Sequence, residues 1–127
     1  MTQPYISSAD DEGETAMLFI GGAFSHAIHK GQLLEPGEGV VQDRAGRETI
    51  DPRTPSDAQR DIAQAALAAV DGVLGHPADL LYARVDLVTD ADGSPIVIEL
   101  ELTEPSLFLP HSDGGALRLV DAVLARN

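Results

Sequence analysis

The feature that most constrains the fold is the stretch YARVDLVTDADGSPIVIELELTEPS at residues 82–106, which places three acids inside two segments of strong β-strand character. A turn-forming run at 90–94 separates the two segments, and the whole therefore predicts a β-hairpin. The three acids are Asp86 in the first segment and Glu99 and Glu101 in the second. Acids are uncommon in buried strands, so their positions bear on function.

The two strands of this hairpin predict a cluster of charge on one face. Side chains alternate along a strand, and a loop at 91–94 sets Asp86 across from Glu99 and Arg84 across from Glu101. Two carboxylates about 5 Å apart repel by roughly 3 kcal/mol at an effective dielectric near 20. Arg84 can neutralise one of them, and the others suit Mg²⁺, which prefers an all-oxygen ligand set. The alternative is a solvated outer sheet face with cross-strand salt bridges.

The first half of the chain predicts a second hairpin. Its β-rich arms, 16–20 and 24–29, meet at the glycine pair Gly21 and Gly22. Residues 31–53 carry glycine, proline and charge with little periodicity, so we expect a long structureless loop there, a candidate lid.

A helix follows each hairpin. The first is expected to begin at an N-cap on Thr54 and to end at Gly72 or Gly75. The second is expected to begin near residues 112–113, and its apolar side chains share one face: Leu117, Val120, Val123 and Leu124. The predicted order is β-β-α-β-β-α, an α+β fold in which two hairpins form an antiparallel sheet, in a single domain at 1–127.

Composition excludes several classes of protein. The chain has 127 residues, a net charge of −13 and eight Lys and Arg, which argues against a nucleic-acid partner. It has no cysteine, no apolar run long enough to span a membrane and no signal-peptide pattern at its N-terminus. We therefore expect a cytoplasmic protein with no membrane partner.

The motifs ARVDLV and IVIELELTEPSLF resemble the metal-binding end of ATP-grasp ligases. The resemblance implies that Asp86, Glu99 and Glu101 bind Mg²⁺ (or Mn²⁺) against the phosphates of ATP, although Glu101 stands where asparagine is more usual. It implies that Arg84 stabilises the transferred phosphate, as in D-alanine–D-alanine ligase-like members. It places Ser106 near positions that contact substrate.

The N-terminal segment extends this resemblance. TQPYI is similar to the hinge strand that pairs with adenine, and GETAMLFIGGAFSHAIHKG to the hairpin that follows it. The implied nucleotide-binding residues are Gln3, Tyr5, Ile6, Glu14 and Lys30. Ala16 stands where glutathione-synthetase-like members often have an arginine. The ELELTEPSLF segment is also similar to cycloserine-pathway members.

The resemblance covers almost the whole chain but only the C-terminal portion of an ATP-grasp domain. It implies an ATP-dependent carboxylate–amine ligase acting through an acyl-phosphate on small carboxylate and amine substrates. The implied missing partner is the N-terminal half, so we expect the isolated chain to be inactive. The alternative is a non-catalytic, stand-alone small domain. In either case an unpaired strand at 2–6 would favour a homodimer.

Overall fold

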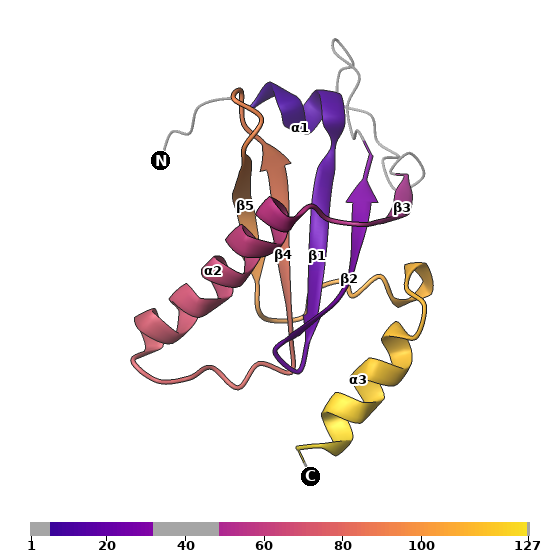
Figure 1. Cartoon of the computed structure of the whole chain (residues 1–127). Coiled ribbons are helices and arrows are strands. Elements are labelled where there is room, and N and C mark those ends of the chain that lie inside the picture. Colours follow the sequence, from indigo (N-terminus) through magenta and orange to yellow (C-terminus); the bar gives the residue numbers. More distant parts are fainter. Residues whose placement is uncertain (1–5, 32–48, 127) are drawn as a thin grey trace.

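A five-stranded antiparallel sheet organises the chain, with the strand order β3-β2-β1-β4-β5 (Figure 1). The computed structural model describes residues 6–31 and 49–126. Its elements are α1 (Ser7–Glu12), β1 (Glu14–Ile20), β2 (Ala23–Lys30), β3 (Ile50–Arg53), α2 (Asp57–Leu74), β4 (Tyr82–Thr89), β5 (Pro95–Glu101), the 3₁₀ helix η1 (Leu109–His111) and α3 (Gly115–Leu124). Within these two ranges, no helix has the length and apolar character needed to cross a membrane.

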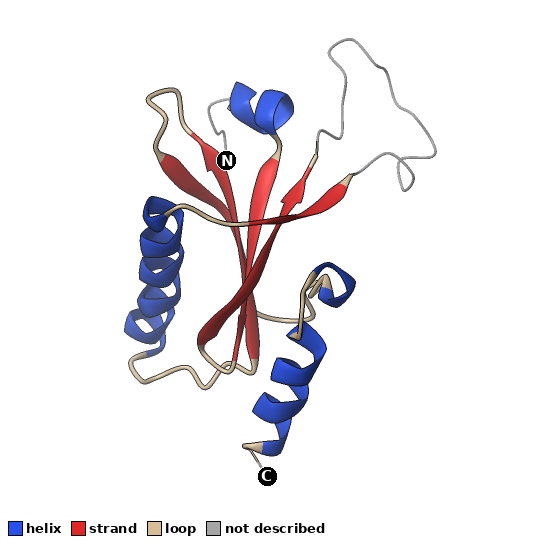
Figure 2. Cartoon of the chain, turned by 45° about the vertical axis from the view of Figure 1, so that its right-hand side comes forward, coloured by secondary structure: helices blue, strands red, loops and turns tan. Residues whose placement is uncertain are grey.

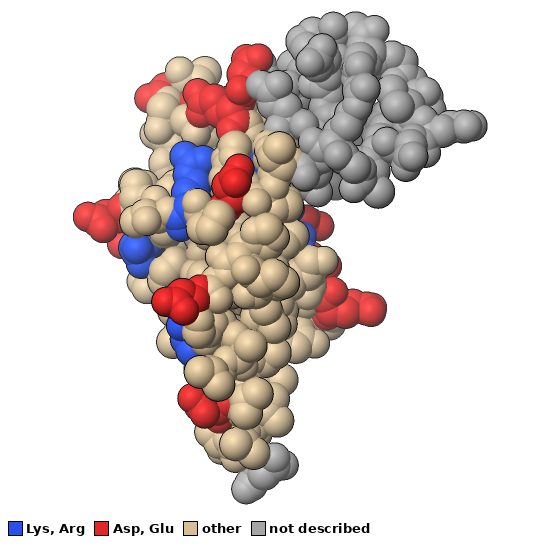
Figure 3. Space-filling view, turned by 90° about the vertical axis from the view of Figure 1, so that its right-hand side faces the viewer, with Lys and Arg blue, Asp and Glu red and all other residues tan. Residues whose placement is uncertain are grey.

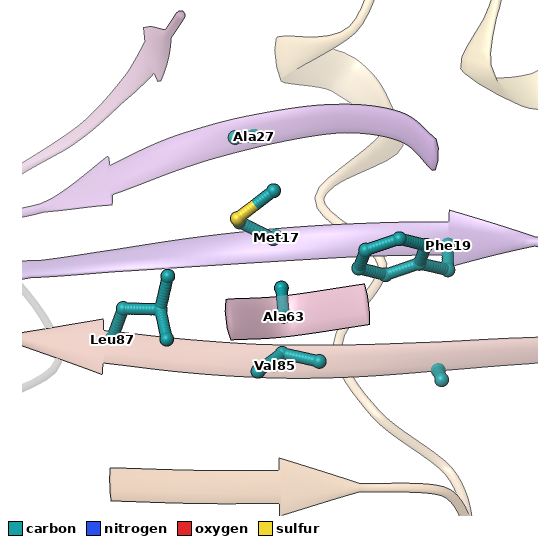
Figure 4. Close-up of a cluster of buried hydrophobic side chains, with 7 residues drawn as sticks. Met17, Phe19, Ala27, Ala63, Val85 and Leu87 are labelled. Carbon is teal, nitrogen blue, oxygen red and sulfur yellow. The ribbon is translucent and has the colours of Figure 1, made fainter. Parts of the chain in front are cut away.

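The core lies on both faces of the central strand β1. Figure 2 shows α2 on one side of the sheet and the segment that ends in α3 on the other. The buried side chains between α2 and the sheet are Met17, Phe19, Ala27, Ala63 of α2 itself, Ala83, Val85 and Leu87 (Figure 4). Those on the opposite face are Ala16, Leu18 and Ile28, against which Ile50, Leu107 and Phe108 pack. Because β1 and β4 are covered on both faces, their side chains are almost all buried.

The predicted order of two hairpins and two helices is confirmed, with three elements added: α1, β3 and the short 3₁₀ helix η1. The added helix α1 precedes the first hairpin, and the added strand β3 occupies the end of the expected loop at 31–53. That part of the loop prediction is wrong, because β3 pairs antiparallel with β2 from Ile50 to Arg53. A proline in this short segment obscured the strand, yet an edge strand tolerates proline since one side of its backbone needs no partner. Residues 32–48 lie outside the described part of the chain.

The predicted hinge strand at 2–6 falls mostly on residues that are not described. Gln3 and Tyr5 are among them. Ile6 is described; it has an extended backbone and precedes α1 directly instead of lying in a strand. The homodimer expected from an unpaired strand at this end therefore stays a prediction.

Both long helices begin later than the sequence predicts. The N-cap of α2 is Ser56, not Thr54: its hydroxyl accepts a hydrogen bond from Gln59 N at 3.2 Å, and Gln59 Oε1 accepts one from Ser56 N at 2.9 Å. This reciprocal capping box satisfies two backbone donors at the helix start. At the other end, the sequence predicts that the helix stops at Gly72 or Gly75, and Gly75 is its C-cap, with a left-handed backbone conformation. The helix α3 begins at Gly115, and its predicted apolar face is exposed.

The capping box gives a direct test of where α2 begins. We expect Ser56→Ala to lower the free energy of unfolding by about 1 kcal/mol, because it removes the acceptor for Gln59 N. The matched control is Thr54→Ala, which removes a hydroxyl two residues earlier and should change stability by less than about 0.5 kcal/mol. Urea unfolding followed by circular dichroism compares the two variants, and a larger loss for Thr54→Ala would contradict the assignment.

Candidate functional site

Six charged side chains meet on the sheet face opposite α2. This charged cluster consists of Glu14, Lys30, Arg84, Asp86, Glu99 and Glu101. It combines four carboxylates with two cations, so it carries two net negative charges. All three predicted metal ligands belong to it, together with the predicted arginine and two of the predicted nucleotide-binding residues.

The pairing of β4 with β5 positions four of these residues. Asp86 lies opposite Glu99 and Arg84 opposite Glu101, as the sequence predicts. The register that achieves this includes a β-bulge: Leu87 pairs with Val97 and Asp86 with Glu99, which leaves Ile98 as the extra residue. Without the extra residue, the two glutamates would point to the core beneath α2. The bulge therefore turns both of them to the charged cluster.

Arg84 is the centre of the charged cluster. Its Nε donates to Asp86 Oδ1 at 2.8 Å, and its Nη2 lies 3.1 Å from Glu99 Oε2 and 2.6 Å from Glu101 Oε2. The side chains of Arg84 and Asp86 are only 8% and 1% exposed. Burial by itself lowers the pKa of Arg84, but the hydrogen bond and charge of Asp86 and the charges of both glutamates raise it above its usual value. The guanidinium is therefore charged at any physiological pH.

Lys30 reaches the same aspartate from the other side of β1. Its Nζ lies 2.6 Å from Asp86 Oδ2 and 3.2 Å from Glu14 Oε2. β2 and β4 flank β1, so about 10 Å separates their backbones. The residue of β1 that pairs directly with Asp86 is Ala16, whose small side chain leaves room for the lysine to span the strand. The sequence alone did not reveal this contact between Lys30 and Asp86.

The donor set of the charged cluster fits a divalent cation in part. Glu99 and Glu101 are 55% and 31% exposed and contact Arg84 through Oε2, so each has its Oε1 left for another ligand. Asp86 differs, since Arg84 and Lys30 engage both of its oxygens. Over residues 6–31 and 49–126, no three His, Asp or Glu side chains are already arranged around a common metal position. Glu99 and Glu101 are thus the more accessible carboxylates of the predicted metal ligands, and Asp86 is held by cations.

The burial of the charged cluster argues against a simple solvated face. Over the whole residue, Asp86 is 0% exposed and Arg84 is 7% exposed. Exposed cross-strand pairs of the kind first considered would leave both residues in water. The alternative of a solvated face with cross-strand salt bridges therefore does not describe the buried Arg84 and Asp86 of β4. Its cross-strand salt bridges to Glu99 and Glu101 are present, and Glu99 faces solvent.

Two other predicted site residues lie apart from the charged cluster. Ser106 is exposed in the segment after β5 and lines a shallow hollow with residues 107–111. Ile6 precedes α1, where its carbonyl accepts from Ala9 N. Among the described residues, no hydrogen bond joins either of them to the six charged side chains. Their predicted contacts with substrate and adenine remain predictions.

Comparison with solved structures identifies the fold. The ATP-grasp ligase PsnB, in complex with a minimal precursor, Mg and ADP, superposes with a TM-score of 0.56 at 20% identity, over 89% of this chain and 32% of PsnB. D-alanine–D-alanine ligase from Bacillus anthracis, in complex with ATP, superposes with a TM-score of 0.53 at 22% identity, over 88% of this chain and 36% of the ligase. The fold is therefore that of part of an ATP-grasp protein.

A nearer relative is similar in sequence as well as in fold. The cycloserine biosynthesis protein DcsG of Streptomyces lavendulae is 50% identical over 98% of this chain. The crystal structure of D-cycloserine synthetase DcsG superposes with a TM-score of 0.86 at 47% identity. No family model matches the chain. The chain spans 41% of the length of DcsG, to which it is similar over almost its whole own length.

Proposed function

We propose that the chain is the part of an ATP-dependent carboxylate–amine ligase that holds Mg²⁺ and the phosphates of ATP at the charged cluster. The observation that carries the proposal is the cross-strand arrangement of Arg84 with Asp86, Glu99 and Glu101 on a fold shared with ATP-grasp ligases. The 50% identity to DcsG over almost the whole chain adds support.

In such a ligase a carboxylate oxygen attacks the terminal phosphorus of ATP and ADP leaves. The amine then attacks the acyl-phosphate carbonyl, and inorganic phosphate leaves as the amide forms and the amine loses a proton. Glu99 and Glu101 would bind Mg²⁺, which supplies charge neutralisation and phosphate orientation when bound. Arg84 uses Nε and Nη2 in the charged cluster, so Nη1 would be the donor to a phosphoryl oxygen or to the tetrahedral adduct.

Two further residues of the charged cluster would assist with the nucleotide. Lys30 has three donor hydrogens, of which two serve Glu14 and Asp86, and the third is available to a phosphate. Glu14 lies next to it at the start of β1, at the position that the resemblance associates with ribose. The remaining determinants of ATP and of the carboxylate and amine substrates would belong to the part of the protein that corresponds to the rest of DcsG.

One observation favours a second candidate. Both oxygens of Asp86 are engaged by cations, as in an internal ion pair whose role is to join the two hairpins. In this view the chain is a non-catalytic domain that keeps the charged cluster for stability. The two candidates differ in whether Glu99 and Glu101 bind a metal.

Titration calorimetry with MgCl₂ distinguishes them. We expect weak, saturable binding that Glu99→Gln and Glu101→Gln each reduce by at least about ten-fold, or about 1.4 kcal/mol, because each removes an anionic oxygen ligand. The matched control is Asp61→Asn, which neutralises an exposed carboxylate on α2 across the sheet and should leave the affinity within about two-fold. Identical heats for all four proteins would favour the non-catalytic domain.

A further inference from the structure

A second site lies away from the charged cluster, in a hollow at the edge of the sheet. β3 pairs with β2 only as far as Ala27, so within the described ranges no strand pairs with the outer edge of β2 at residues 24–26. The hollow opens there, between the start of α2 on one side of the sheet and the η1–α3 segment on the other. Its volume is 300 Å³, within the range of small-ligand sites.

Positive charge is concentrated around this hollow. Three arginines line it, Arg53, Arg60 and Arg118, against a single acid, Asp113. This is a local excess of two positive charges in a chain whose net charge is −13 and which has only eight Lys and Arg. Figure 3 shows the side of the molecule that carries β3 and α3: its few Lys and Arg side chains lie towards one margin, and much of the described surface is uncharged.

Among the described residues, the arginines of this hollow have no carboxylate partner: no salt bridge joins Arg53, Arg60 or Arg118 to an acid. Arg60 lies over the ring of Phe24, with 4.6 Å from its Cζ to the ring centroid, a contact that orients the guanidinium without neutralising its charge. Arg53 is exposed at the end of β3.

Arg118 is held in place by neutral acceptors. It donates from Nε to Ser25 Oγ at 2.9 Å, from Nη1 to Asp113 O at 3.0 Å and from Nη2 to Ser112 Oγ at 2.9 Å. These three bonds leave two of its five N–H donors for a ligand. Next to it, His26 Nε2 donates to Leu107 O at 2.9 Å, which connects the floor of the hollow to the segment after β5. Burial lowers the pKa of His26, the hydrogen bond to Leu107 O opposes this, and the charge of Arg118 lowers it further.

We propose that this arginine-lined hollow binds a small dianion, a phosphate group or a dicarboxylate. Guanidinium groups bind both kinds of anion through paired N–H donors, and the excess of two positive charges matches a dianion. The overall negative charge of the chain disfavours non-specific anion binding, so saturable binding would require this local arrangement.

Calorimetric titration of the 127-residue chain tests the proposal, with EDTA present so that no metal contributes at the charged cluster. Inorganic phosphate and succinate are titrated separately into the wild type, into Arg53→Gln/Arg60→Gln and into Arg126→Gln. The last variant removes the same kind of charge two residues beyond the end of α3. We expect saturable binding of at least one anion, at least ten-fold weaker in the double variant and within two-fold of wild type in Arg126→Gln. Phosphate binding without succinate binding would assign a phosphoryl ligand, and binding of both would extend the assignment to dicarboxylates.

Amide NMR shifts locate the site, and circular dichroism checks that the double variant is folded. Amide NMR shifts on adding phosphate should fall at residues 24–27, 53–60 and 111–118. If the double variant does not keep the wild-type circular dichroism spectrum, Arg53→Gln alone replaces it, since Arg53 is exposed. The proposal is overturned if neither anion saturates, if Arg126→Gln weakens binding as much as the double variant, or if the shifts centre on Lys30 and Arg84.

Discussion

Replacing Arg84 with methionine is expected to lower the free energy of unfolding by about 3 to 5 kcal/mol. The arginine contacts three carboxylates, and one of them, Asp86, is fully buried. Removing the guanidinium leaves that carboxylate with Lys30 alone and leaves Glu99 and Glu101 without their shared partner. The cost of an incompletely paired buried charge is much larger than the net value of an intact pair.

The control for this variant is Arg126→Met. Arg126 pairs with Asp79 at 2.5 Å, but Asp79 is 84% exposed, so this loss should be about 1 kcal/mol or less. A double-mutant cycle of Arg84→Met with Asp86→Asn measures the coupling directly, and we expect it to exceed about 1 kcal/mol. Urea unfolding monitored by two probes supplies the free energies. Equal losses for Arg84→Met and Arg126→Met would show that Arg84 does not compensate the buried carboxylate.

Gly13→Ala is expected to cost about 3 kcal/mol or more, although it adds only one methyl group. Gly13 joins α1 to β1 with φ 72° and ψ −165°, a region that is essentially restricted to glycine. A Cβ there would lie 2.2 Å from Lys30 O and 2.8 Å from His29 Nε2. The backbone of β2 would have to move, and with it Lys30 of the charged cluster.

Gly75→Ala separates the contribution of backbone strain from that of the clash. Gly75 has φ 74°, close to that of Gly13, but a Cβ there would meet no atom within 4 Å. Its cost should be about 1 to 2 kcal/mol, the usual penalty for a left-handed residue other than glycine. Thermal unfolding of both variants makes the comparison. If Gly13→Ala is no more destabilising than Gly75→Ala, the close approach between Gly13 and Lys30 is wrong.

Local sequence signals predicted much of this fold. The glycine pair at 21–22 and the turn at 90–94 located both hairpins, because turn chemistry depends on a few neighbouring residues. Alternation along the strands then predicted the opposition of Asp86 to Glu99 and of Arg84 to Glu101.

Other features depend on contacts that no local pattern carries. Two bulges, at Ser25 and Ile98, shift the registers of the hairpins by one residue, and each changes which side chains share a face. Without the first bulge, Glu14 would lie opposite His29 instead of Lys30. The contact of Lys30 with Asp86 also joins residues 56 positions apart, across an intervening strand. The period of the sequence pattern could assign Lys30 and Asp86 to strands, but it could not predict that their side chains are in contact.

The charged cluster also bears on the order in which the chain folds. The β1–β2 hairpin contributes Glu14 and Lys30, and the β4–β5 hairpin contributes Arg84 with three carboxylates. Each hairpin can form early, since its strands are neighbours in sequence, but β1 meets β4 only after β3 and α2 have been traversed. Pairing β1 with β4 also buries Asp86. The ion pair between Lys30 and Asp86 must therefore form in the same step, because an unpaired buried carboxylate is costly. We therefore expect the docking of the two hairpins, and not the formation of either one, to limit the folding rate.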